Sequence, residues 1–147
     1  YLEKGGFSSY QSEYPFSMVT KKGSILSSVS SIANSNADKN YILIRNIFEE
    51  PTQEKFNTYL VNIKTREIEE EYELKSNFTN SIEISNKLIK PEIFLTTKKF
   101  LGIPMYVSIK NKFISFEHTH PPHEYILSSD RFKKIAELKK QVNEIIN

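Results

Sequence analysis

The chain has 147 residues, of which 38% are hydrophobic and 26% are charged, and its formal net charge is +2. These values fit one globular domain, and no apolar run approaches the ~18 to 20 residues of a membrane span. The absence of cysteine excludes disulfides, thiolate metal sites and cysteine nucleophiles. The basic residues are scattered in pairs, so we expect no nucleic-acid partner. The composition leaves the cellular compartment open.

Residues 1–24 are rich in Gly, Ser and Tyr and have no clear hydrophobic period. We predict an extended N-terminal arm, whose aromatic side chains anchor it on the domain or against another subunit. The chain starts without an initiator Met or a signal-peptide pattern, so we expect a trimmed N-terminus. Residues 25–147 are predicted to form a single α+β domain.

The segment from Ser24 to Asn36 predicts a short, Ser-rich helix. Its apolar residues, Ile25, Val29, Ile32 and Ala33, have helical spacing. Ser24 is a candidate N-cap residue, because its hydroxyl can accept a hydrogen bond from the first helical turn.

From residue 41 the hydrophobic period changes to two, which is typical of β-strands. The residues 64–67 and 111–112 predict the turns of two hairpins. In the segment 68–74, one side of the predicted strand carries Ile68, Tyr72 and Leu74, and the other side carries Glu69, Glu71 and Glu73, which indicates a strand with one solvated face. The predicted strands are 41–48, 56–63, 68–74, 81–84, 92–97, 104–110 and 113–119.

The last segment, which follows Asp130, predicts an amphipathic helix. Phe132, Ile135, Leu138, Val142 and Ile145 form one apolar stripe. We therefore expect an α+β fold with a predominantly antiparallel sheet, half-barrel or sandwich-like, on which this C-terminal helix packs.

All three histidines lie in one stretch, His118-Thr-His120-Pro-Pro-His123-Glu124. His118 and His120 share a face of the predicted strand with Ile114 and Phe116, which is the better candidate for the core-facing side. The two prolines force the chain out of the sheet, and this turn could bring His123 or Glu124 toward the first two histidines. Two His and a carboxylate are ligands for zinc and non-haem iron, so these four residues are candidate ligands of a divalent Zn, Fe, Ni or Mn ion.

The pattern His118-x-His120-x-x-x-Glu124 resembles the first metal motif of the cupin family. The resemblance covers about fifteen residues and implies a metal held by two histidines and a glutamate on a β-barrel strand. Lys112 stands where the family has a glycine, and a second motif with a further histidine has no counterpart in this chain.

His118-x-His120-Pro121, followed by Asp130 at a helix start, also resembles the JAMM metalloprotease signature. That resemblance implies a zinc-dependent hydrolase with an upstream catalytic glutamate, for which Glu49 or Glu50 is a candidate. Ser128 and Asp130 are one residue closer together than in the family pattern. We do not assign the chain to either family.

Two other interpretations of the histidines stay open. They are either a polar turn, in which Glu117 and Glu124 satisfy the imidazoles, or a pH-responsive cluster. The chain has no phosphate-binding loop and no nucleophile elbow. The sequence therefore favours a non-catalytic interaction or accessory module, with protein partners or a homo-oligomer, and a metal-binding protein or metal-dependent enzyme as the alternative.

Overall fold

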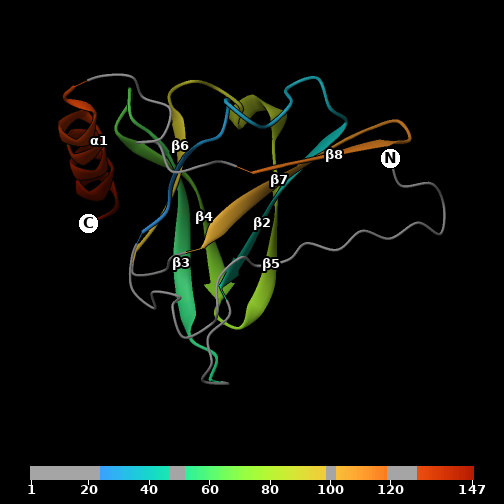
Figure 1. Ribbon diagram of the computed structural model, residues 1–147, viewed down its shortest axis with the longest axis horizontal. Helices are drawn as coiled ribbons and strands as arrows, with labels where there is room; N and C mark the ends of the chain where they lie inside the picture. Colours follow the sequence, from blue (N-terminus) through green and yellow to red (C-terminus); the bar gives the residue numbers. More distant parts are fainter. Residues whose placement is uncertain (1–23, 47–51, 99–101, 119–128) are drawn as a thin grey trace.

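The computed structural model describes residues 24–46, 52–98, 102–118 and 129–147. Two four-stranded antiparallel sheets and a C-terminal helix make up this part of the chain (Figure 1). This confirms the predominantly antiparallel α+β architecture. The elements are β1 (Leu26–Ser28), β2 (Lys39–Asn46), β3 (Lys55–Asn62), β4 (Glu67–Lys75), β5 (Phe78–Ile84), the 3-10 helix η2 (Asn86–Leu88), β6 (Ile93–Thr97), β7 (Ile103–Lys110), β8 (Phe113–His118) and α1 (Arg131–Ile146).

The first sheet has the order β1-β6-β3-β4, and the second has the order β5-β2-β7-β8. The turn Ser76–Asn77 joins β4 of one sheet to β5 of the other, with Asn77 at a φ of 50°. Asparagine tolerates this left-handed conformation better than most residues. The two-residue turn at 111–112 between β7 and β8 confirms the predicted hairpin.

One hydrophobic core lies between the two sheets. Leu60, Leu74 and Leu95 enter it from the first sheet, and Ile42 and Tyr106 enter it from the second. The hydroxyl groups of Tyr106 and Ser27 are 2.7 Å apart, so a buried hydrogen bond links β7 to β1 across the core. Because the alternate residues of each strand face this core, the sheets also present two outer faces.

The predicted Ser-rich helix is wrong. Its first residues form β1, where Ser27 pairs with Leu95 of β6 and the Ile25 amide donates to the Thr97 hydroxyl at 2.9 Å. Only one helical turn remains, closed by the Ala33 amide on the Val29 carbonyl at 3.0 Å. Pairing with β6 therefore outweighs the helical spacing of the apolar residues. The many serines contribute to this result, because serine is a weak helix former.

A register shift opposite Leu60 and Val61 changes the pattern of β4. Leu60 pairs with Glu70, but the next residue, Val61, pairs with Ile68. Glu69 is thus the extra residue of a β-bulge. The bulge places Ile68 on the face opposite to Tyr72, although the simple alternation predicted that both share one face.

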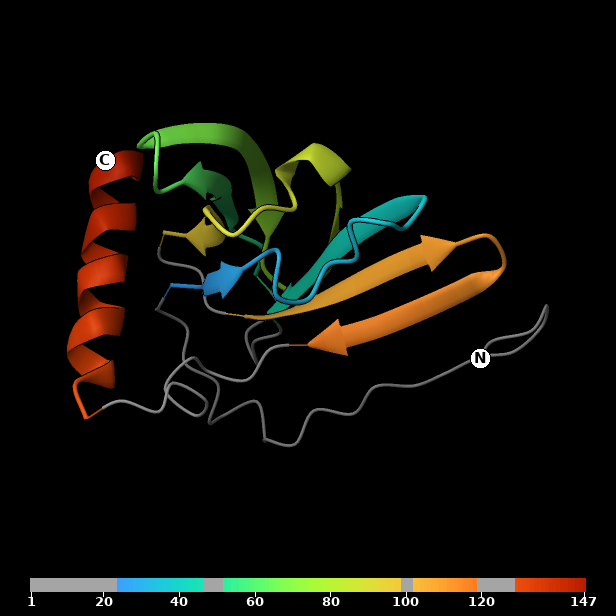
Figure 2. The ribbon, with the colours of Figure 1, turned by 90° about the horizontal axis from the view of Figure 1, so that it is seen from above.

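Helix α1 covers the outer face of the first sheet, beside β3 and β4 (Figure 2). Val142 is 1% exposed and Val61, on the outer face of β3, is 0% exposed. The Arg66 guanidinium contacts the Glu144 carboxylate at 3.0 Å and ties the helix to the β3–β4 turn. The helix therefore packs on the sheet through the C-terminal half of its stripe, whereas Phe132 is 62% exposed.

In the part of the chain that the structure describes, no helix has both the length and the apolar character needed to cross a membrane. The predicted arm over residues 1–24 falls, except for Ser24, outside the described residues.

Candidate protein-binding face

The histidine stretch begins at the end of β8. His118 is the last residue of this strand, is exposed, and lies opposite Met105 of β7. His120, His123 and Glu124 fall outside the described residues. Within those residues, no group of three His, Cys, Asp or Glu side chains could hold a metal ion. The metal site therefore stays a prediction.

The expected burial of Ile114 and Phe116 is wrong. The two side chains are 40% and 48% exposed. They lie opposite Ile109 and Val107 of β7, whereas the core residue Tyr106 lies opposite Glu117. Because neighbouring residues of a strand point to opposite faces, Ile114 and Phe116 are on the outer face of the second sheet. The alternation predicted correctly that they share a face with His118, but not which face that is.

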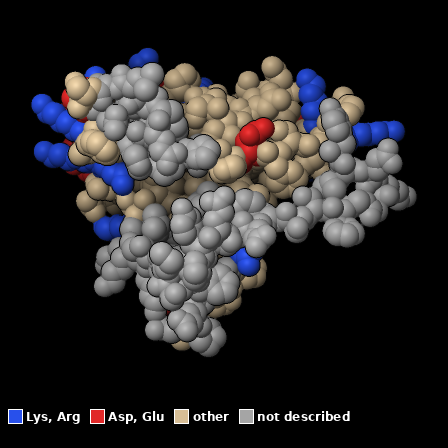
Figure 3. Space-filling view, in the orientation of Figure 1, with Lys and Arg blue, Asp and Glu red and all other residues tan. Residues whose placement is uncertain are grey.

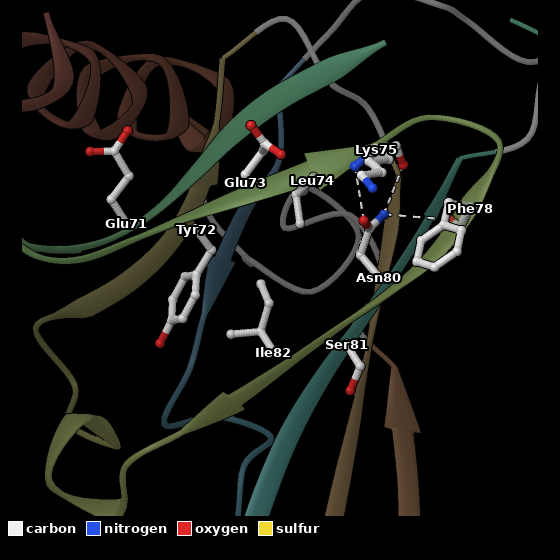
Figure 4. A pocket seen from close by; sticks show the side chains of 9 residues that line it. All are labelled: Glu71, Tyr72, Glu73, Leu74, Lys75, Phe78, Asn80, Ser81 and Ile82. Carbon is white, nitrogen blue, oxygen red and sulfur yellow. Dashed lines mark hydrogen bonds between the residues drawn. The ribbon is translucent and has the colours of Figure 1, made fainter. Parts of the chain in front are cut away.

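A hollow of about 450 Å³ lies at the corner where β4 and β5 diverge into different sheets (Figure 4). Figure 4 shows Tyr72 and Ile82 directed toward the space between the strands, and Glu71 and Glu73 on the other side of β4. Asn80 holds the corner: its side chain accepts from the Lys75 amide at 2.8 Å and donates to the Lys75 carbonyl at 2.9 Å. The lining residues are Glu71, Tyr72, Glu73, Leu74, Lys75, Phe78, Asn80, Ser81 and Ile82.

The glutamates beside this hollow are engaged on the outer surface of the first sheet. Glu73 pairs with Lys55 at 3.0 Å, and the Glu71 carboxylate accepts from the side-chain amide of Asn57 at 2.6 Å. Both carboxylates remain exposed to solvent. They form cross-strand pairs of the kind that stabilise a solvated sheet face, as the sequence predicted. The two carboxylates that border the hollow are thus held in surface pairs.

The outer face of the second sheet is apolar over three adjacent strands. Cross-strand registers place Tyr41 beside Val107 and Val107 beside Phe116, while Leu43 lies beside Met105. We call this surface the β2–β7–β8 face. Its residues are Tyr41, Leu43, Met105, Val107, Ile109, Ile114 and Phe116.

Burial on the β2–β7–β8 face falls from the middle strand to the edge. Val107 is 7% exposed, Tyr41 and Leu43 are half-buried, and Phe116 is 48% exposed. Among the described residues, α1 lies against β3 and β4 of the other sheet and not against this face. The face is thus an apolar surface that the described part of the chain leaves partly open to solvent.

Polar side chains border the β2–β7–β8 face on the side of β5. Glu83 and Ser81 lie opposite Tyr41 and Leu43, and both are exposed. Lys39, at the start of β2, approaches Glu83 to 3.9 Å. An apolar surface with a polar rim is typical of an interaction site.

One signal in the sequence could have indicated this face. In 41–44 (Tyr-Ile-Leu-Ile) every residue is apolar, and 105–107 (Met-Tyr-Val) has the same character. A strand of an antiparallel sheet with one wet face alternates apolar and polar residues, so such runs predict that both faces are to be covered. The Glu-rich β4 lacks this signal, as its solvated outer surface requires.

Basic side chains lie at both ends of the molecule. Figure 3 shows Lys and Arg at the end where α1 lies and also at the opposite end, which is consistent with the exposed Lys133, Lys134, Lys139 and Lys140 of α1 and with the exposed Lys110 and Lys112 of the β7–β8 hairpin. Comparison with known proteins adds no family: the chain matches no family model, no curated protein and no solved structure.

Proposed function

We propose that the protein is a non-catalytic interaction module that binds a protein partner through the β2–β7–β8 face. The observation that carries this proposal is the contrast between apolar character and exposure. Seven apolar side chains share the outer face of one sheet, and Ile114 and Phe116 are 40% and 48% exposed. Apolar surface of this kind is removed from water by binding, at roughly 25 cal/mol for each Å² buried.

The geometry of the face suits a protein ligand. A sheet presents a broad, shallow surface, whereas small-molecule sites are concave and enclose most of their ligand. The centre of the face is apolar, and its rim carries Lys39, Ser81 and Glu83. This is the arrangement of a protein–protein interface, in which a dry centre supplies affinity and a polar rim supplies specificity.

The proposal is tested by photo-crosslinking in the cells that produce the protein. A benzophenone amino acid replaces Leu43, on the face, or Glu73, an exposed residue on the outer surface of the first sheet. We expect a discrete adduct with another protein from the Leu43 probe and a much weaker one from the Glu73 probe. Equal labelling from both positions, or none from Leu43, would contradict the proposal.

A substitution experiment separates specific binding from random labelling. A Met105→Lys variant, with the probe retained at Leu43, should lose the adduct, because a lysine in the middle of the face must be desolvated when the partner binds. The matched control is Thr79→Lys, at an exposed position of β5 in the same sheet, which should keep the adduct. An adduct that survives Met105→Lys would show that the face is not the binding surface.

A further inference from the structure

Strand β8 is an edge strand of the second sheet and differs from β1 and β4, the edge strands of the first sheet. Among the described residues, no strand pairs with its outer side. It has six residues and a continuous register with β7, and Glu117 is its one charged residue apart from the terminal His118. Natural proteins protect such edges with Lys, Pro, bulges or short strands. In the first sheet, the edge strand β1 has only three residues. The other edge strand of that sheet, β4, carries a bulge and several glutamates.

The direction of the backbone groups of β8 follows from the hairpin turn. A two-residue turn makes its flanking residues, Lys110 and Phe113, a hydrogen-bonded pair. The neighbouring residue Ile109 should then direct its backbone groups away from β8. Its carbonyl accepts a hydrogen bond from the Asp38 amide at 2.8 Å on the β2 side, which agrees with this pattern. Since the pattern alternates, Ser115 directs its amide and carbonyl toward β7, and Ile114 and Phe116 direct theirs toward the open edge.

We propose that β8 pairs antiparallel with β8 of a second copy of this chain, with Ser115 opposite Ser115 on the two-fold axis. In this register, Ile114 lies opposite Phe116 of the second copy. Both residues direct their backbone amides and carbonyls toward the edge, so they form the hydrogen-bonded pairs. The register also places Ile114 beside Phe116 twice on the outer face. The sheet β5-β2-β7-β8 of one copy and the same sheet of the second copy then form one eight-stranded sheet. The second copy continues the β2–β7–β8 face.

Charge supports the same register. The pairing places Phe113 opposite Glu117 of the second copy, and Phe113 lies opposite Lys110 within its own hairpin. Lys110 and Glu117 of the second copy, both exposed, therefore lie two strands apart in one row across the sheet and carry opposite charges. The register centred on Glu117 would instead place two carboxylates directly opposite each other, which is destabilising.

The area involved predicts a weak dimer. Phe113 and Phe116 are 60% and 48% exposed. With about 200 Å² for a phenylalanine side chain, they offer on the order of 200 Å² for each copy. Even with the strand backbones, the total lies well below the roughly 1,200 Å² of a stable interface. We therefore expect association at protein concentrations of about 100 µM and above, and a monomer at about 1 µM.

This inference goes beyond the proposed function. Ile114 and Phe116 belong to both surfaces, but Met105 lies on the face away from the β8 edge, so Met105→Lys tests the face and the cross-link through Ser115→Cys tests the edge. Sedimentation velocity of the full chain from about 10 to 500 µM should show a shift from monomer to dimer. Phe116→Asp should suppress the shift, and Ile114→Asp is a second variant of the same edge. Ser81→Asp, exposed on β5 at the other edge of the sheet, should leave it unchanged.

Disulfide trapping tests the register. The chain has no cysteine, so a Ser115→Cys variant carries a single thiol. Directly opposed residues of a non-hydrogen-bonded pair have Cα atoms about 4.5 Å apart, within the range that a disulfide spans. Under mild oxidation Ser115→Cys should form a covalent dimer faster than Ser81→Cys. A chain that is monomeric at about 500 µM, with equal cross-linking of the two variants, would overturn the proposal; faster cross-linking of Phe116→Cys would overturn the register.

Discussion

The outer faces of the two sheets have opposite surroundings in the described structure. On the first sheet, α1 covers β3 and buries Val61 and Val142 to 0% and 1% exposure. On the second sheet, Ile114 and Phe116 remain 40% and 48% exposed. The comparison shows that apolar character alone does not determine exposure. Among the described residues, a covering element lies on the first face and not on the second, which is the face that we propose binds a partner.

The largest effect is expected where the helix covers the first sheet. Val142→Asp would place a carboxylate at a site that is 1% exposed, without a positive partner designed for it. We expect the free energy of unfolding, measured by urea denaturation, to fall by about 3 kcal/mol or more, or α1 to leave the sheet.

Phe116→Asp is the matched substitution on the second sheet, and it should cost less than about 1 kcal/mol because the side chain is already half exposed. Equal losses in the two variants would remove the difference between the faces.

The corner between β4 and β5 joins the two sheets. The Asn80 side chain contacts the Lys75 backbone and donates to the Ile44 carbonyl at 3.1 Å. Asn80→Ala leaves these buried groups without a partner, so we expect a loss of about 1 to 3 kcal/mol in the free energy of unfolding. Ser81→Ala, at the exposed neighbouring position, should stay within about 0.5 kcal/mol. An Asn80→Ala variant as stable as Ser81→Ala would show that the corner does not depend on this amide.

A dye that binds exposed apolar surface measures the openness of the second face directly. The double variant Ile114→Thr/Phe116→Thr should reduce the fluorescence of bound 1-anilinonaphthalene-8-sulfonate and change the free energy of unfolding by at most about 1 kcal/mol. The exposed pair Thr79→Ser/Ser81→Thr on β5 serves as the control. Unchanged fluorescence would mean that the two residues are covered in solution.

The smallest effect on stability is expected at the exposed end of β8. The metal hypothesis predicts stoichiometric zinc, iron, nickel or manganese in protein purified without a His-tag, and its loss in a His118→Ala/His120→Ala variant. Elemental analysis measures the metal content. Because His118 is exposed, the variant and wild type, both stripped of metal, should differ by less than about 0.5 kcal/mol in the free energy of unfolding. A metal-free wild type whose melting temperature ignores added divalent ions would refute the hypothesis.

Local patterns in the sequence determined most of the elements. The period of two predicted the segments that became β2 to β8, and the apolar stripe after Asp130 predicted α1. The turn at Asn111 was also predictable, because asparagine adopts the φ of 55° found there. These features depend on neighbouring residues alone, so a single sequence contains the necessary information.

The tertiary structure alone decided three further features. Pairing with β6 made a strand of residues that have helical spacing, and the bulge at Glu69 moved Ile68 to the other side of β4. The division of the strands into two sheets decided that Phe116 faces outward. Each of these depends on partners far away in the chain, and the same apolar side chain is buried on a covered face and exposed on an open one.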